Sequence, residues 1–115
     1  MKYTESLKKN QDFRNVYRRG KSVSNRYLVL YKYPNKEAIN RLGISVSKKV
    51  GNSVVRSRVT RLIRESYRLK EENIINPGWD FIVIARGTAN GASYQEIADA
   101  LDHLLKQQKV LEKSS

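Results

Sequence analysis

Cysteine is absent from this chain of 115 residues, which excludes a disulfide framework and any thiolate metal site. Long apolar runs are absent too, because no stretch approaches the roughly 20 apolar residues that a membrane-spanning helix needs. The first ten residues hold a single Leu, so they do not look like a signal peptide. Only the two ends look loose, at the first few residues and at 113–115. These absences predict one cytoplasmic domain over residues 1–115 with no membrane association.

Groups for acid, base or metal chemistry are also scarce. His103 is the single histidine, and its neutral to acidic surroundings indicate a surface or boundary residue. No metal-ligand spacing links the aspartates Asp12, Asp80, Asp99 and Asp102. A self-sufficient nuclease needs an acid–base pair or metal ions held by carboxylates. The sequence therefore predicts no catalytic residue and no metal held by the protein.

Acidic residues are few in the first 70 positions, which hold 4 Asp or Glu against 19 Lys or Arg. Residues 71–115 reverse this balance with 7 acidic and 4 basic residues, and the whole chain carries a net charge of +12. A surface that only needs to be soluble intersperses both signs. The asymmetry therefore favours a polyanionic partner, and in particular a nucleic acid.

Hydrophobic periodicity predicts alternating helices and strands. A first helix is expected from about Asn10, with Asn10 as its cap, to Gly20, and Leu7 is expected to pack on its apolar face. Strands are expected at residues 22–33, 41–47 and 81–85, a second helix at 53–70, and a last helix after Ser93, which forms a capping box with Glu96. This order predicts an α+β fold, a two-layer sandwich with a small, mostly antiparallel sheet and one parallel crossover.

Side-chain spacing predicts which faces are buried. On residues 22–33, Leu28 and Leu30 share one face, and the other face carries Val23, Tyr27, Val29, Tyr31 and Tyr33. The apolar side of the second helix holds Val55, Val59, Leu62, Ile63, Ser66 and Leu69. The apolar side of the last helix holds Ile97, Leu101, Leu104 and Leu105.

A run of cations is the densest functional signal. Lys48 and Lys49 precede a Gly51-Asn52 turn, and the side of the second helix away from its apolar face carries Arg58, Arg61, Arg64 and Arg68, with Arg56 at the boundary. Guanidinium groups suit paired hydrogen bonds to phosphates. A solvated face would be expected to include acids at helical spacing, but Glu65 is the only acid between Lys48 and Lys70. The pattern predicts binding to a nucleic-acid backbone.

Aromatic residues in the first third of the chain give a second signal. Phe13 and Tyr17 share one face of the first helix and could flank the strand face that carries Val29 and Tyr31. Such a groove, rimmed by Arg14, Arg18 and Lys32, would let the bases of a single strand stack while the cations hold the backbone. Ordinary half-buried packing on a strand is the alternative, and the residues alone leave both open.

Taken together, these segments resemble the protein component of bacterial ribonuclease P over almost the whole chain. The matching residues are Leu7-Lys8-Lys9-Asn10, Asp12-Phe13, Gly20, Ser22-Val23, Asn25-Arg26, Val29-Leu30-Tyr31, residues 41–49, Gly51-Asn52, Arg56, Arg58, residues 61–64 and residues 82–86. The block from Arg41 to Arg64 is specific, because strand, lysine pair, turn and arginine stripe agree in order and spacing. Ser53, Ser57 and Thr60 stand where the family usually has Ala, Asn and Lys.

The resemblance implies a division of labour. In this family the RNA subunit holds the catalytic Mg²⁺ ions and cleaves the 5′ leader from precursor tRNA, while the protein is a non-catalytic subunit without a small-molecule cofactor. It implies that Lys48, Lys49, Arg56, Arg58, Arg61, Arg64 and Arg68 bind the RNA subunit. It also implies a leader-binding cleft at Phe13, Arg14, Tyr17, Val29 and Tyr31, and a left-handed crossover between parallel strands, against the usual hand. A ribosomal or other structural RNA-binding protein is the alternative function.

Overall fold

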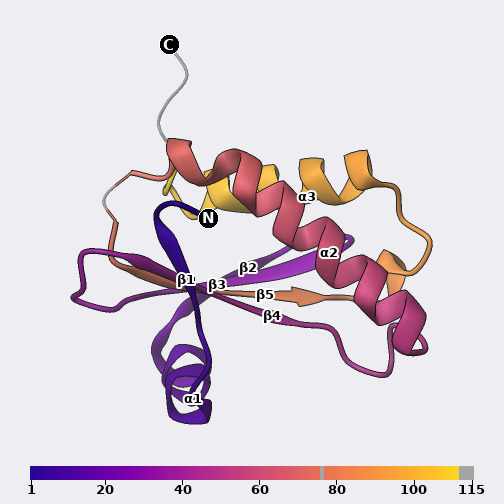
Figure 1. The fold of residues 1–115 in the computed structure, drawn as a ribbon, viewed down its shortest axis with the longest axis horizontal. Coiled ribbons are helices and arrows are strands. Elements are labelled where there is room, and N and C mark those ends of the chain that lie inside the picture. The colour runs from indigo at the N-terminus through magenta and orange to yellow at the C-terminus, as the bar shows by residue number, and fades with distance from the viewer. Residues whose placement is uncertain (76, 112–115) are drawn as a thin grey trace.

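The computed structural model describes residues 1–75 and 77–111, which form a mixed five-stranded sheet with helices on both faces (Figure 1). The strands are β1 (Thr4–Ser6), β2 (Lys21–Ser24), β3 (Leu28–Pro34), β4 (Asn40–Ser45) and β5 (Trp79–Ala85). The helices are α1 (Asn10–Arg19), α2 (Ser53–Lys70) and α3 (Tyr94–Gln107), with short 3-10 turns η1 (Glu71–Asn73) and η2 (Gly87–Ala89).

The sheet has the strand order β1-β4-β5-β3-β2. β4 pairs in parallel with β1 and with β5, whereas β3 pairs antiparallel with β2 and β5. The α2 helix makes the crossover between the parallel strands β4 and β5. Figure 1 shows α2 and α3 together on one face of the sheet and α1 on the other. The predicted α+β class and parallel crossover are confirmed, and α1 adds cover to the face that a two-layer sandwich would leave open.

The main core lies between the sheet and the α2–α3 layer. Leu28 and Leu30 of β3 are fully buried there, as predicted. They meet Val59 and Ile63 of α2 and the predicted apolar side of α3. A second, smaller cluster of Leu7, Val16 and Ile82 lies under α1. Removing these side chains from water is the main stabilising term for a domain of this size.

The α2 helix begins and ends at the predicted residues. The Asn52 side chain caps it by accepting a hydrogen bond from the Val55 amide at 3.0 Å. One prediction about its buried side is wrong, because Leu69 is 55% exposed. Tyr67 is fully buried instead, and its hydroxyl lies 2.8 Å from the Thr4 hydroxyl of β1. That partner lets a polar ring enter the core, and helical spacing could not show it.

The predicted single strand at 22–33 is in fact a hairpin of β2 and β3. The Asn25 side chain accepts hydrogen bonds from the amides of Tyr27 and Leu28, and so forms the turn between the strands. Val23 and Tyr27 therefore pack against the main core rather than on the predicted aromatic side.

Lys32 also differs from its predicted place on the rim of the aromatic groove. It follows Leu28 and Leu30 on the core side of β3, where its ammonium donates to the Gln108 carbonyl at 2.6 Å and sits over the Trp79 ring. Burial, together with the nearby cations Lys21 and Lys109, lowers the pKa of Lys32.

The two ends of the chain bring further differences. Residues 4–6 form the edge strand β1 rather than a loose end, and Thr4 and Leu7 are buried. Asn10 is the first helical residue of α1, so Lys9 stands at the cap and Asn10 makes no capping bond. The predicted fraying at 113–115 lies outside the described residues. None of the described helices is long and apolar enough to cross a membrane.

Candidate nucleic-acid interface

Three aromatic rings gather on the side of the sheet that α1 covers. Phe13 and Tyr17 stand one turn apart on α1 with ring centroids separated by 6.3 Å, and Tyr17 meets Tyr31 of β3 edge-on at 5.2 Å. Val29 lies two residues before Tyr31 and so shares its side of the strand. Tyr17 keeps 40% of its surface exposed, and the other three side chains are half-buried. We call these four residues the aromatic face.

Polar groups border the aromatic face. Arg14 and Arg18 are exposed on α1, and Arg14 makes a long 3.4 Å hydrogen bond to Gln11. Burial raises the pKa of Tyr17, and a hydrogen bond with Ser45 of β4 offsets part of that rise. The Tyr17 hydroxyl therefore stays protonated at neutral pH and can donate a hydrogen bond beside the rings.

A glycine in β4 sets how closely α1 approaches the sheet. A Cβ atom on Gly43 would lie 2.6 Å from Cζ of Phe13 and 3.4 Å from Cδ2 of Leu7. Contacts between carbon atoms are favourable at about 3.5–4.0 Å. The Phe13 ring can pack against the strand only because residue 43 has no side chain.

The predicted arginines lie on α2, which covers the face of the sheet opposite α1 (Figure 1), and Lys48 and Lys49 lie in the loop before that helix. We call them the arginine surface: Lys48, Lys49, Arg56, Arg58, Arg61, Arg64 and Arg68. In the described part of the chain, no acidic side chain forms an ion pair with Lys48, Lys49, Arg61 or Arg64. All four are exposed and free to meet phosphates.

Three members of the arginine surface are less available to RNA, two because they bond to the protein and one because it is half-buried. Arg58 donates to the Ala92 carbonyl at 3.0 Å, next to the start of α3. Arg68 pairs with Glu65 at 2.5 Å, and this exposed pair raises the pKa of Arg68 and lowers that of Glu65. Arg56 is half-buried, and its Nε has no hydrogen-bond partner among the described residues. The side chains that most readily reach RNA are therefore those nearer the middle of the helix and the lysine pair.

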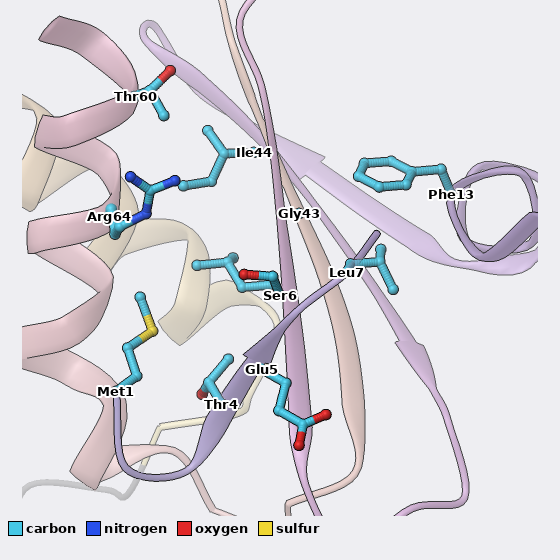
Figure 2. Close-up of a pocket in the computed structure, with 11 residues that line it drawn as sticks. Met1, Thr4, Glu5, Ser6, Leu7, Phe13, Gly43, Ile44, Thr60 and Arg64 are labelled. Carbon is cyan, nitrogen blue, oxygen red and sulfur yellow. The ribbon is translucent and has the colours of Figure 1, made fainter. Parts of the chain in front are cut away.

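Two hollows meet beside Ile44 of β4, past the end of the pairing between β4 and β1. One, of about 500 Å³, is lined by Ile44, Val46, Ser53, Arg56, Ser57, Thr60, Arg61 and Arg64. The other, of about 380 Å³, also includes Thr60 and Arg64 but extends past β1 to Phe13 (Figure 2). In Figure 2, Arg64 and Phe13 lie on opposite sides of the strands. The arginine surface and the aromatic face thus meet around one edge of the sheet.

The sequence reasoning missed the lining of this edge. Residues 4–7 and Met1 border the second hollow, and their contribution follows from β1 pairing with β4. A strand of three residues is too short for an alternating pattern to reveal. Ser57 and Thr60, which depart from the family pattern, line the first hollow beside the arginines. The Thr60 hydroxyl donates to the Arg56 carbonyl at 2.8 Å.

Comparison with known proteins identifies the family of the chain that carries this interface. The family model described as Ribonuclease P matches residues 1–109. The chain belongs to the ribonuclease P protein family. It is 57% identical to the ribonuclease P protein component of Lachnoclostridium phytofermentans, over 96% of this chain and 95% of that one. It is 59% identical to the protein of the same name from Clostridium acetobutylicum, over 85% and 83% of the two chains.

Solved structures of the family share this fold. The Staphylococcus aureus RNase P protein superposes with a TM-score of 0.85 at 44% identity, covering 93% of this chain and 97% of that one. The Thermotoga maritima RNase P protein gives a TM-score of 0.80 at 31% identity, covering 90% and 96%. As a ribonuclease P protein component, this chain is a subunit of an endonuclease that includes an RNA partner. These matches support the ribonuclease P assignment over a ribosomal or other structural RNA-binding role.

Proposed function

We propose that this chain binds the catalytic RNA of ribonuclease P through its arginine surface and holds the 5′ leader of precursor tRNA on its aromatic face. The observation that carries the proposal is the separation of the two surfaces on opposite sides of one sheet. One side offers exposed cations that suit phosphates, and four of them, Lys48, Lys49, Arg61 and Arg64, have no acidic partner among the described residues. The other side offers contacting rings, which suit unpaired bases. Binding both RNAs in the cytoplasm would let the protein bring the leader to the cleavage site.

The metal chemistry of cleavage belongs, in this proposal, to the RNA subunit. The described residues contain no group of three or more His, Cys, Asp or Glu placed to hold a metal ion. His103 is exposed on α3, and its Nδ1 lies 3.4 Å from Nδ2 of the Asn25 side chain. The α3 helix covers the side of the sheet away from the aromatic face. Mg²⁺ prefers oxygen ligands and keeps several waters, and RNA phosphates supply such oxygens. The protein's contribution is to bind and orient the substrate.

Cleavage assays with precursor tRNA at low Mg²⁺ test this division. We expect the RNA subunit alone to cleave poorly, the purified protein alone not to cleave, and the two together to cleave efficiently. Cleavage by RNA-free protein at near-stoichiometric levels would contradict the placement of the chemistry. A protein that binds the RNA subunit but leaves cleavage unchanged would contradict the substrate role.

Tyr17→Ala tests the aromatic face with little risk to the fold, because Tyr17 is the most exposed of its rings. Stacking of one base on an aromatic ring is worth about 1–3 kcal/mol. We expect the assembled holoenzyme to bind a precursor with a leader of several nucleotides roughly tenfold more weakly. Affinity for mature tRNA and for the RNA subunit should be unchanged. An equal loss for both substrates would mean that Tyr17 does not contact the leader.

A further inference from the structure

Arg41 of β4 links the sheet to α1 through three hydrogen bonds. Its Nε and Nη2 donate to the two carboxylate oxygens of Asp80 at 2.7 and 2.8 Å, and its Nη1 donates to Oδ2 of Asp12 at 3.3 Å. Asp80 lies on β5 directly beside Arg41 and is only 3% exposed. It also accepts a hydrogen bond from the Asn35 side chain at 2.9 Å. Paired bonds fix the plane of the guanidinium, so its remaining nitrogen is directed at the first turn of α1.

Apart from this link, α1 buries little of its surface against the sheet. Val16 is the one fully buried side chain of this helix, and it packs with Leu7 and Ile82. With one fully buried side chain and the half-buried Phe13 packed on β4, the tilt of α1 depends on what its first turn contacts. Asp12 provides a second attachment one turn earlier, next to Phe13. The tilt of α1 sets where Phe13 and Tyr17 stand relative to Tyr31.

We propose that Asp12, Arg41 and Asp80 are positioning residues, which hold α1 at the tilt that makes the aromatic face fit the leader. This inference rests on the proposed role of that face. All three donor nitrogens of Arg41 already meet carboxylates, and its hydrogen bonds to Asp80 raise its pKa, so it stays charged and paired. Arg41 therefore acts through α1 rather than as a phosphate ligand, unlike the exposed arginines of α2.

Asp12→Ala separates positioning from simple charge. The substitution removes one negative charge, and electrostatics alone would make the protein bind RNA more tightly. Positioning predicts the opposite sign, a loss of roughly threefold to tenfold in holoenzyme affinity for a precursor that carries a leader. Asp99→Ala is the matched control, since Asp99 is an exposed helical aspartate on α3 with a single hydrogen bond from Gln95. It should leave leader binding unchanged or slightly tighter.

A double-mutant cycle with Phe13→Ala gives the decisive readout. If Asp12 acts through the position of the Phe13 ring, Asp12→Ala should cost the Phe13→Ala holoenzyme less leader affinity than it costs the wild type, because coupled residues are not additive. Additive losses, or an equal loss for mature tRNA, would overturn the proposal. Asp12→Asn, which keeps the shape and one acceptor oxygen, should fall between wild type and Asp12→Ala, and a thermal melt of each variant checks the fold. Absence of any leader effect from Phe13→Ala itself would instead reject the proposed function of the aromatic face.

Discussion

Replacing Gly43 by Ala should displace the Phe13 ring of α1 by a predictable amount. The new Cβ would lie 2.6 Å from Cζ and 2.8 Å from Cε1 of Phe13. Restoring a normal carbon–carbon contact requires the ring to move by about 1 Å. Overpacking of this kind costs about 1–3 kcal/mol. Phe13 is half-buried and can swing toward solvent, so we expect a loss near 1 kcal/mol, or about 4 °C in Tm.

Gly43→Ala should also weaken leader binding, by a free energy similar to its cost in stability. A ring displaced by about 1 Å no longer stacks in register with a base, and one base stack is worth about 1–3 kcal/mol. We expect the holoenzyme to bind a leader-bearing precursor about fivefold to tenfold more weakly. Binding of mature tRNA and of the RNA subunit should stay at wild-type values. Fluorescence-detected titrations with the two substrates measure this difference directly.

Gly87→Ala is the matched control for Gly43→Ala. A Cβ on Gly87 would have the Lys49 carbonyl oxygen at 4.0 Å as its nearest neighbour, so the same substitution fits without a clash. Its effect on stability should stay within about 0.5 kcal/mol. If Gly43→Ala lowers Tm but leaves leader affinity intact, Phe13 is packing only and does not bind the leader. If neither quantity changes, the close contact between Phe13 and β4 is refuted.

Two further predictions concern the opposite side of the sheet. Arg61→Ala should weaken binding to the RNA subunit and reduce the steepness of its salt dependence, d log K/d log[salt], by roughly 0.7–0.9 for one lost phosphate contact. Titrations at several salt concentrations measure this slope. An unchanged slope would mean that Arg61 is solvated and contacts no phosphate. Burial opposes ionisation of Asp102, but its ion pairs with Lys106 at 2.8 Å and Lys70 at 3.1 Å outweigh burial and lower its pKa from 3.8. The ionised carboxylate of Asp102 therefore adds stability above about pH 4, and this stability is lost as the pH falls through the lower pKa of the folded state. Asp102→Asn should flatten the acid side of a Tm series measured between pH 7 and pH 2.5. An unchanged acid side would show that the ion pairs with the two lysines contribute nothing to stability.

Helical and strand periodicity in the sequence predicted much of the fold. The residues of α2 follow a 3.6-residue pattern over most of its length, and the Gly51-Asn52 turn marks its start; the predicted bounds match those of the structure. The capping box of Ser93 and Glu96 likewise forms as predicted at the start of α3. Leu28 and Leu30 lie in the core because alternation on a strand survives whatever the partner strand is.

The errors arose where a local pattern depends on a distant partner. Lys32 and Tyr27 carry apolar stems and rings that fit either side of a strand. Which side of the strand each occupies depends on Asn25, which forms the turn between β2 and β3, and on Gln108, 76 residues away, whose carbonyl accepts a hydrogen bond from the Lys32 ammonium. Leu69 was predicted to be buried and is exposed, and Tyr67 lies in the core, where the Thr4 hydroxyl of β1 provides a partner for its hydroxyl.

The candidate interface also combines features that local spacing predicts with contacts that only the folded chain shows. Spacing alone placed the arginines on the side of α2 away from its apolar face and brought Phe13 and Tyr17 together, because both patterns lie within one helix. The meeting of Tyr17 with Tyr31, the packing of Phe13 on Gly43 and the bond from Arg41 to Asp12 join segments far apart in the chain. Local spacing encodes which side of an element a residue occupies, whereas only the packed tertiary structure determines which residues of other elements lie opposite it.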